Sequence, residues 1–267
     1  MGPALLFCPA DRPDRFAKAA DRADAVILDL EDAVAPEHKV TARDALTSSS
    51  LDPERTIVRL NAFDSGLFAD DLVALAHTPY RTVMVAKAES AEQLSGLDRF
   101  SVIALCETAA GVLAAPSIAA LPQVVALMWG AEDLVASLGG TSSRFADGSY
   151  RDVARHARSS VLLAAGAYGK AAIDAVHVDV NDLAGLDAEA RDAAASGFAA
   201  SAVIHPSQVE TVRTAFHPSE AELDWARRVI AGAASNGGVF RLDGRMIDGP
   251  VVRHAERVVG RSRPTMD

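Results

Sequence analysis

Eight short apolar segments, each followed by a helical pattern, limit what this chain can fold into more than any other feature. Most are almost continuously apolar, which is typical of parallel strands that are covered on both faces. They lie at residues 4–8, 25–30, 56–61, 82–87, 101–107, 124–130, 172–178 and 201–206. Because the strand-then-helix order never pauses for the reversal of a doubly wound sheet, the sequence predicts an α/β fold of the (β/α)8 TIM barrel type.

Residues that start or stop helices separate the predicted strands. Pro13 and Pro36 suit the first turns of two helices, and a long helix is expected over about 150–169. Gly197 suits the end of a helix over 186–196, because glycine readily adopts the left-handed conformation found there.

The last part of the chain, residues 219–267, exceeds what a barrel needs. Ser219 suits the cap of an amphipathic helix over 220–234, and residues 235–252 alternate polar and apolar side chains between glycines, as a short hairpin does. We therefore predict a barrel over 1–218 and a C-terminal helix and hairpin extension that acts as a lid or as an oligomer contact.

Charge and cysteine content narrow the classes of partner and compartment. The formal net charge of −10 argues against bulk attraction to nucleic acid or to an anionic membrane. No run reaches the roughly eighteen apolar residues of a membrane-spanning helix, and residues 3–9 lack the cationic start of a signal peptide. Cys8 and Cys106 lie in apolar runs, so neither a disulfide nor a thiolate metal site is expected. A cytoplasmic location is the simplest expectation.

Polar side chains gather where the predicted strands end. They are Asp29, Glu31, Asp32, Arg59, Asn61, Lys87, Glu89, Glu107, Glu132 and Asp133. In a parallel barrel these strand ends share one face, which is where such enzymes carry their chemistry. The sequence therefore predicts an acidic cluster that contains one arginine and one lysine.

Glu107 and Asp133 follow two consecutive predicted strands and so are expected to converge. Magnesium prefers oxygen ligands, keeps several waters and usually takes only one or two protein carboxylates. The sequence thus predicts that these two residues hold one Mg2+ ion. The alternative is that each carboxylate caps the helix that follows it.

Arg59 lies between Val58 and Leu60 in a strand, where its permanent charge needs an anionic partner. Either it forms an ion pair with Glu31 or Asp32, or it binds a substrate carboxylate. Lys87 has the same two interpretations.

Gly130 and Ala131 have little or no side chain at a predicted strand-to-helix turn, so their amides can approach an anion. Ordinary turn chemistry is the alternative. His177 and His205 lack partners at metal-ligand spacing, and we interpret both as ordinary hydrogen-bonded side chains. Asp248 precedes Gly249 and Pro250 and suits a turn.

Eight motifs in order resemble the citrate lyase β-subunit-like proteins, which share a superfamily with malyl-CoA and other hydroxyacyl-CoA lyases. They are FCPADRP, DLEDAV, VRLN, KAE, ETAAG, WGAEDL, IHPSQ and MIDGP. The resemblance covers nearly the whole chain. It implies a (β/α)8 barrel, a homotrimer or possible hexamer, Mg2+ at the barrel mouth and an acyl-CoA thioester as substrate.

The resemblance also implies roles for individual residues. Glu107 and Asp133 would be the magnesium ligands, and Asp248 would be an acid/base that enters the active site of the adjacent subunit. Substrate contacts are implied for Arg59, Glu107, Gly130 and Ala131. Supports that fix water, magnesium and the arginine are implied for Glu31, Asp32 and Lys87.

Two positions depart from the family pattern. Ala86 stands where a proline is usual, and Ala110 stands where an arginine is frequent. Neither touches the predicted metal pair, but Ala110 bears on CoA or substrate specificity.

The resemblance implies a Mg-dependent carbon–carbon lyase that cleaves a 3-hydroxyacyl-CoA to an acyl-CoA and a 2-oxo acid, or forms it by a Claisen-type condensation. In this reaction Arg59 is expected to act with the metal, and Asp248 to reprotonate the acyl-CoA enolate. One alternative is a metal-dependent aldolase that acts on free 2-oxo acids without CoA. Another is a citrate lyase β-type subunit that acts on an acyl-carrier partner.

Overall fold

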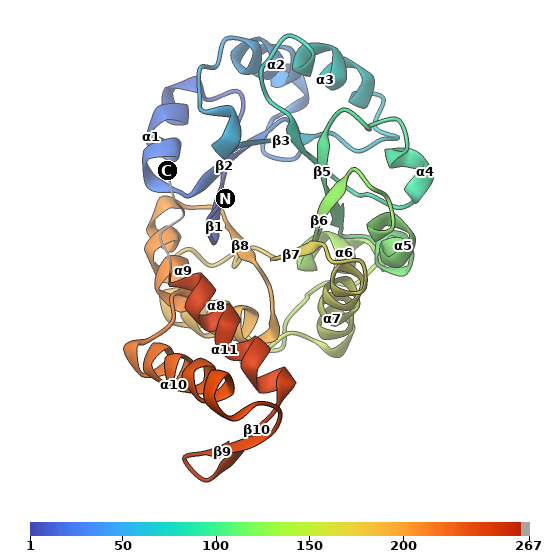
Figure 1. Cartoon of the computed structure of the whole chain (residues 1–267). Helices are drawn as coiled ribbons and strands as arrows, with labels where there is room; N and C mark the ends of the chain where they lie inside the picture. Colours follow the sequence, from blue (N-terminus) through green and yellow to red (C-terminus); the bar gives the residue numbers. More distant parts are fainter. Residues whose placement is uncertain (263–267) are drawn as a thin grey trace. The chain divides into compact units, whose positions relative to one another are not determined.

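Eight parallel strands close into a barrel in sequence order, with β1 paired to both β2 and β8 (Figure 1). The computed structural model describes residues 1–262. The strands are β1 (Ala4–Pro9), β2 (Ala25–Asp29), β3 (Thr56–Leu60), β4 (Thr82–Val85), β5 (Ser101–Cys106), β6 (Val124–Trp129), β7 (Ala171–Asp174) and β8 (Ala200–Val203). The predicted (β/α)8 barrel is confirmed.

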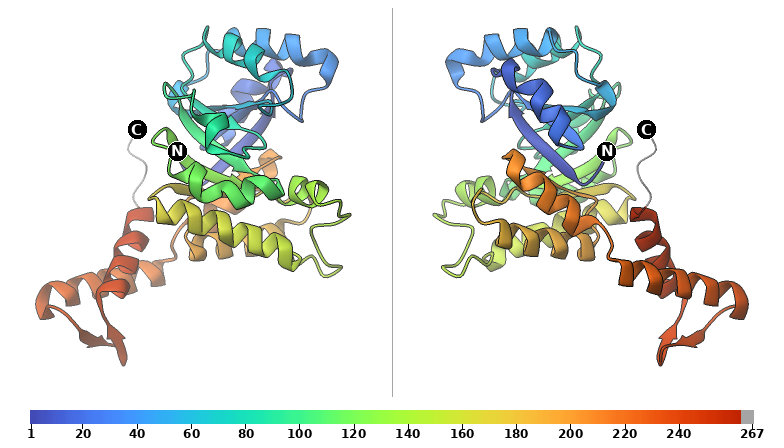
Figure 2. Two further views of the ribbon diagram at one scale, coloured as in Figure 1. Left: turned by 90° about the vertical axis from the view of Figure 1, so that its right-hand side faces the viewer. Right: turned by 90° about the vertical axis from the view of Figure 1, so that its left-hand side faces the viewer.

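Helices surround this barrel (Figures 1 and 2). They are α1 (Phe16–Arg22), α2 (Lys39–Thr47), α3 (Phe68–Leu75), α4 (Ala91–Leu94), α5 (Ala109–Ala119), α6 (Ala131–Ser137), α7 (Asp152–Ala167), α8 (Leu183–Ser196) and α9 (Val209–Phe216). Among the described residues, no helix has the length and apolar character needed to cross a membrane.

Both faces of the strands are buried, which explains their continuous apolar runs. One set of alternating residues fills the barrel interior: Leu5, Ala25, Ile27, Ile57, Met84, Ile103, Leu105, Ala126, Met128, Ile173, Ala200 and Ala202. The residues between them, such as Leu6, Leu28 and Val58, are also buried and belong to the opposite face of the strands.

The same alternation positions the polar residues at the barrel mouth. Phe7, Asp29, Arg59 and Glu107 each follow an interior core residue by two positions. Because side chains along a strand alternate between its faces, these four form the next interior layer beyond the apolar core.

The strand β7 ends at Asp174, four residues earlier than predicted. Val176 packs against the barrel core from the following loop, so its apolar character reflects core packing and not strand pairing. The helix α8 starts at Leu183, three residues earlier than predicted, because the Asp182 side chain caps it by accepting a hydrogen bond from the Gly185 amide. It ends at Gly197, which has a φ of 111°.

Contacts divide the chain into two units, Met1–Val212 and Arg213–Asp267. The second unit contains α10 (Glu220–Asn236), a hairpin of β9 (Phe240–Leu242) and β10 (Arg245–Ile247), and α11 (Gly249–Arg261). The hairpin is shorter than predicted, because Asp248 caps α11 and Pro250 lies in its first turn. The lid role of 219–267 stays a prediction, and residues 263–267 lie outside the described residues.

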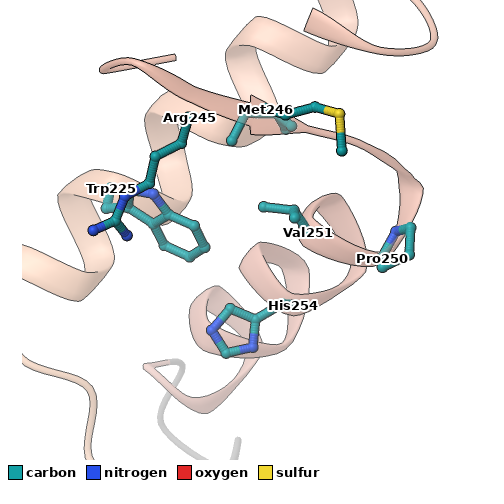
Figure 3. Close-up of a pocket in the computed structure, with 7 residues that line it drawn as sticks. Trp225, Arg245, Met246, Pro250, Val251 and His254 are labelled. Carbon is teal, nitrogen blue, oxygen red and sulfur yellow. The ribbon is translucent and has the colours of Figure 1, made fainter. Parts of the chain in front are cut away.

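A small core holds the second unit together through Leu223, Ala226, Val229, Ile247, Ala255 and Val258. Beside it lies a pocket of about 440 Å³ (Figure 3). Its lining residues are Trp225, Arg245, Met246, Ile247, Pro250, Val251 and His254. The rings of Trp225 and His254 contact each other, with centroids 5.5 Å apart.

Candidate functional site

Lys87, which follows β4, connects the loop after β2 with the first turn of α6 at the barrel mouth. Its Nζ lies 2.5 Å from Glu31 Oε1, 3.3 Å from Asp32 Oδ2 and 3.4 Å from Asp133 Oδ1. Burial opposes the charge of the ammonium, but the hydrogen bond and charge of Glu31, with other nearby carboxylates, raise the pKa of Lys87 above its usual value. The predicted ion-pair interpretation of Lys87 is therefore confirmed.

The backbone of Lys87 has an unusual conformation that serves the same site. Its φ is 49°, in the left-handed region that non-glycine residues seldom occupy. In this conformation the Lys87 N–H donates a hydrogen bond to Glu107 Oε1 at 3.2 Å. Strained backbone of this kind is typical of functional sites, and here both the backbone N–H and the ammonium of Lys87 contact carboxylates of the mouth.

Glu107 is 3% exposed, and Lys87 is its only hydrogen-bond partner within residues 1–262. Its Oε2 lies close to Gly130: a Cβ added there would be 2.8 Å from this oxygen. Burial, and next the negative charge of Asp133, raise the pKa of Glu107 to about 8. The two carboxylates thus interact repulsively across the mouth, a charge imbalance that a bound cation would relieve.

Helix capping does not explain these carboxylates. The cap of α5 is Thr108, whose Oγ1 accepts a hydrogen bond from the Gly111 amide at 3.1 Å. The cap of α6 is Gly130, with no side-chain hydrogen bond. The capping alternative is therefore wrong for both Glu107 and Asp133.

The donor set suits a hard divalent cation with open positions. Within the described part of the chain, no group of three or more His, Cys, Asp or Glu side chains is placed to share a metal. An ion bound by Glu107 and Asp133 would take its other ligands from water or substrate, as Mg2+ commonly does. The residues present fit such an ion.

Arg59 makes a two-point contact with Asp29 (Nε to Oδ1 2.7 Å, Nη2 to Oδ2 2.6 Å). Its Nη1 lies 2.9 Å from Glu31 Oε2, as the ion-pair interpretation of Arg59 predicts, and binding of a substrate carboxylate stays a prediction. The ring of Phe7 covers one face of the guanidinium, with Cζ 4.8 Å from the ring centroid. Among the described residues Asp32 forms no ion pair with Arg59; it contacts Lys87 instead.

Two supporting residues were missed by the sequence analysis. Asp29 was placed in the acidic cluster but not recognised as the partner of Arg59, although the two are directly opposite in the pairing of β2 with β3. Lys39 donates hydrogen bonds to Leu30 O at 2.6 Å and Glu31 O at 2.7 Å, and so fixes the turn that carries Glu31. Burial lowers the pKa of Lys39. No sequence signal distinguishes it from an exposed lysine.

The first turn of α6 carries Gly130, Ala131 and Asp133 to the mouth. No side chain caps the start of this helix, so its first backbone N–H groups can donate hydrogen bonds to a ligand. The helix dipole favours an anion at the same place. Ser143 donates to Glu132 Oε1 at 2.6 Å and ties this turn to the following loop.

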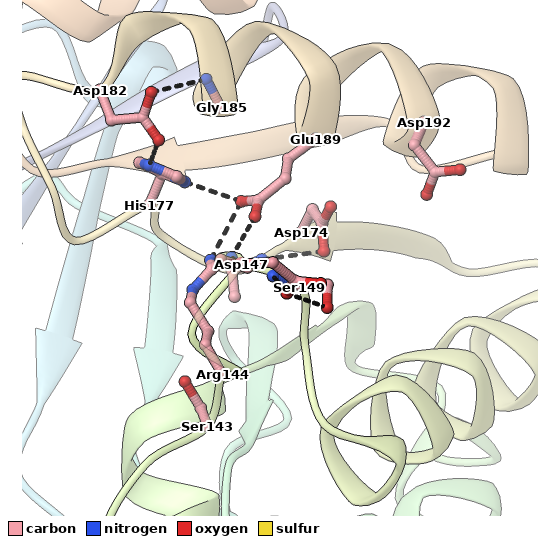
Figure 4. Close-up of polar contacts among 12 residues, drawn as sticks. Ser143, Arg144, Asp147, Ser149, Asp174, His177, Asp182, Gly185, Glu189 and Asp192 are labelled. Carbon is pink, nitrogen blue, oxygen red and sulfur yellow. Dashed lines mark hydrogen bonds and ion pairs between the residues drawn. The ribbon is translucent and has the colours of Figure 1, made fainter.

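A polar network lies farther round the barrel (Figure 4). His177 Nδ1 lies 2.9 Å from Glu189 Oε2, and its Nε2 lies 3.3 Å from Asp182 Oδ2. Arg144 also pairs with Glu189. His205 Nδ1 contacts Ser207 Oγ at 2.7 Å. Both histidines are hydrogen-bonded side chains, as interpreted from the sequence.

Asp248 lies in the second unit, where its side chain accepts a hydrogen bond from the Val251 amide at 3.3 Å. It therefore acts as the cap of α11. Its acid/base role stays a prediction.

The chain is similar to known proteins over most of its length. A model of the family HpcH/HpaI aldolase/citrate lyase matches residues 4–206. A citrate lyase subunit beta-like protein of Mycobacterium tuberculosis is 58% identical over 261 residues, 98% of this chain and 96% of that protein. The human mitochondrial citramalyl-CoA lyase is 33% identical, over 96% of this chain and 84% of that protein.

A crystal structure of the Mycobacterium tuberculosis protein CitE, in complex with magnesium, acetoacetate and coenzyme A, has the same fold. The TM-score is 0.94 at 58% identity, and the match covers 98% of each chain. With its barrel, its mouth of paired charges and these matches over most of its length, the chain belongs to the HpcH/HpaI aldolase/citrate lyase family.

Proposed function

We propose that this protein is a Mg-dependent carbon–carbon lyase that cleaves a 3-hydroxyacyl-CoA to an acyl-CoA and a 2-oxo acid, and catalyses the reverse Claisen-type condensation. The observation that carries the proposal is the placement of Glu107 and Asp133 around Lys87 at one barrel mouth, where Glu31 joins Lys87 to Arg59. The relative bound to magnesium, acetoacetate and coenzyme A supports the ligand classes, and its CoA favours a thioester substrate over a free 2-oxo acid.

Glu107 and Asp133 would hold the magnesium ion. When bound, Mg2+ acts as a Lewis acid that polarises the substrate oxygens and stabilises negative charge on them. Lys87 keeps Asp133 in place through its ammonium and Glu107 through its backbone amide. Glu31 and Asp32 hold the Lys87 ammonium in turn.

The chain's own groups bind and orient the substrate. The Nη1 group of Arg59 binds the carboxylate of the fragment that leaves as a 2-oxo acid. The amides of Gly130 and Ala131, at the start of α6, donate to the same carboxylate. Fixing both ends of this carboxylate aligns the carbon–carbon bond that breaks.

The cleavage moves one proton out and one in. A base takes the hydroxyl proton, the C–O bond becomes C=O, and the electron pair of the carbon–carbon bond passes to the α-carbon of the acyl-CoA. That carbon then takes a proton from Asp248. We propose that Asp248 is supplied by the neighbouring subunit of a homotrimer, as the family resemblance implies.

The proposal is tested by incubating the purified protein with malyl-CoA or citramalyl-CoA, with Mg2+ or with EDTA. A lyase releases a 2-oxo acid and no free thiol, and needs Mg2+. A thioesterase would release free CoA thiol without a 2-oxo acid. Absence of cleavage for every thioester, together with cleavage of a free 4-hydroxy-2-oxo acid, would favour the aldolase alternative.

The substitution Asp133→Ala should abolish turnover, by at least about a thousandfold, while the fold persists. Circular dichroism and thermal unfolding report the fold. Asp152→Ala is the matched control, because Asp152 is also an acidic residue in the first turn of a helix and is exposed. Activity of Asp133→Ala without added metal would contradict the proposed site.

A further inference from the structure

Asp29 is completely buried, and its hydrogen bonds are all made within the protein. Oδ1 accepts from the Glu31 amide at 2.8 Å and from Arg59 Nε at 2.7 Å. Oδ2 accepts from the Ala33 amide at 3.2 Å and from Arg59 Nη2 at 2.6 Å. A carboxylate has about four sites for accepting hydrogen bonds. With all of them used, Asp29 is unsuited to bind a cation, to contact substrate or to act as a base.

These contacts fix the guanidinium of Arg59 in two respects. Asp29 takes the edge formed by Nε and Nη2, and the Phe7 ring covers one face at 4.8 Å. A guanidinium is planar and rigid, so one fixed edge and one fixed face determine where its remaining N–H groups point. The Nη1 group is left with an ion pair to Glu31 at 2.9 Å and no hydrogen bond to Asp29.

Glu31 is not able to replace Asp29 in this role. Its Oε1 is held by Lys87 Nζ at 2.5 Å, and its Oε2 accepts from the Asp32 amide at 3.0 Å in addition to the contact with Arg59. If Arg59 turned fully towards Glu31, it would withdraw that carboxylate from Lys87. Asp29 therefore holds the Nε and Nη2 edge of the arginine, and Glu31 can bridge Arg59 Nη1 and the Lys87 ammonium with one oxygen each.

We propose that Asp29 and Phe7 are positioning residues for Arg59: Asp29 sets the edge and Phe7 the plane of the guanidinium, so that its Nη1 group receives the carboxylate of the 2-oxo acid. The inference rests on the proposed function. It also predicts which ligands should bind more weakly when a positioning residue is replaced. Loss of Asp29 or Phe7 weakens ligands in proportion to their dependence on that carboxylate and leaves the metal and the CoA part unaffected.

The experiment measures three affinities for the full-length protein and its variants. Calorimetry gives the dissociation constants of Mg2+ and, in saturating Mg2+, of pyruvate, and condensation kinetics give the KM of acetyl-CoA. For Asp29→Asn, which keeps the shape and removes the charge, we expect pyruvate to bind at least about tenfold more weakly, with the other two constants within about twofold. For Phe7→Leu we expect a loss of about two- to fivefold, again for pyruvate alone.

Asp71→Asn is the matched control. Asp71 is completely buried, accepts hydrogen bonds from Arg43 Nε at 2.8 Å and from the Asn61 amide at 2.9 Å, and does not contact Arg59. It should lower the thermal midpoint as Asp29→Asn does but leave pyruvate binding unchanged. A purely structural role of Asp29 would make the two variants behave alike.

The outcomes separate the two proposals. If the wild type binds pyruvate but Asp29→Asn binds it equally well, or loses Mg2+, pyruvate and acetyl-CoA together, the positioning role is wrong and the lyase proposal stands. If Asp29→Asn does not fold, the selective loss in Phe7→Leu supports the positioning role, and an unchanged Phe7→Leu overturns it. A wild type that binds no 2-oxo acid overturns both.

Discussion

At Gly130 the absence of a side chain makes room for a carboxylate. A Cβ there would lie 2.8 Å from Glu107 Oε2 and 2.9 Å from Glu107 Cβ, distances that real Cβ contacts do not show. Since Glu107 is buried, its side chain has little freedom to move aside. The glycine is thus required by the close approach of two loops, and not by its own backbone angles, which are extended.

We therefore expect Gly130→Ala to weaken Mg2+ binding by about tenfold or more, because it displaces one of the two proposed ligands. Calorimetric titration with Mg2+ measures the effect. Gly166→Ala in α7 is the control, since nothing lies within 4 Å of a Cβ there. That helical substitution should raise the unfolding free energy by roughly 0.5–1 kcal/mol and leave Mg2+ affinity unchanged. Equal Mg2+ affinity in both variants would count against Glu107 as a ligand.

The titration of Glu107 gives a second prediction. Its pKa is raised to about 8 by burial and by Asp133, so the side chain is mostly protonated at neutral pH before a cation binds. Mg2+ binding should release close to one proton at pH 7 and tighten as the pH rises towards 8. Calorimetry in two buffers of different ionisation enthalpy counts the protons. Proton release that persists in Glu107→Gln would assign it to another group.

The raised pKa of Glu107 also makes the metal-free protein less stable as the pH rises. The folded pKa of Glu107, about 8, lies above its ordinary value of 4.5. Its contribution to the stability of the metal-free protein is therefore complete below about pH 4.5 and is lost as the pH rises through 8. Added Mg2+ should raise the thermal midpoint more at pH 8.5 than at pH 6.

Most residues of the mouth are predictable from the sequence because strand ends of a parallel barrel share one face. The pairing of Asp29 with Arg59 was not predicted, although each follows an interior residue, Ile27 or Ile57, by two positions. Counting by twos from the core would have predicted this cross-strand pair. The left-handed backbone of Lys87 has no such signal, because it follows from tertiary contacts and not from local preference.

Among the helices and strands, the observed boundaries differ from the predicted ones where side chains outside the hydrophobic pattern determine them. Asp182 starts α8 by capping it, and Asp248 starts α11 in the same way. Hydrophobic periodicity predicts that a helix exists, but capping selects its first residue. The loop after β7 carries an apolar run because Val176 packs against the core, so apolar character there does not indicate a strand.

The loop after β7 and the helix α8 are joined by an ion pair whose pH range can be stated. The hydrogen bond that protonated His177 donates to Glu189 raises the pKa of His177 above 6.5. Burial opposes the charge of Glu189, but hydrogen bonds from His177 and Arg144 lower its pKa below 4.5. The histidine contribution is complete below 6.5 and is lost as the pH rises through its raised pKa, and the glutamate contribution is lost only in acid.

His177→Gln should therefore cost more at pH 5.5 than at pH 8.5, by roughly 1–2 kcal/mol of unfolding free energy. Urea denaturation at the two pH values measures the difference. His77→Gln, at an exposed position, is the control and should show no pH-dependent cost. A His177→Gln cost that is the same at both pH values would mean that the histidine is neutral in the folded protein.

The barrel was predictable because eight parallel strands that are buried on both faces, each followed by a helix, pack well as a closed barrel. The role of the second unit was not predictable. Its sequence specifies a helix and a hairpin with a core of their own, but it does not specify what this unit binds. Asp248 in this unit caps a helix. For its carboxylate to act as an acid or base, the unit must also lie against an active site. The proposed trimer supplies that meeting through the neighbouring subunit.

Complementation tests this arrangement. Asp133→Asn and Asp248→Asn should each be almost inactive alone, because one lacks a proposed magnesium ligand and the other the proposed proton donor. If Asp248 serves the adjacent subunit, mixed oligomers prepared by co-expression contain sites with an intact Asp133 from one subunit and an intact Asp248 from its neighbour. Random mixing in equal amounts makes about a quarter of the sites complete, the product of two chances of one half.

Activity near a quarter of the wild-type value, lost when the two variants are expressed separately and mixed without subunit exchange, would support action between subunits. If Asp248 instead served its own barrel, every site in the mixture would lack one of the two groups, and the co-expressed protein would be as inactive as its parents. Light scattering on the same sample fixes the number of subunits. A monomer with full activity would exclude both the trimer and the transfer of Asp248 to a neighbour.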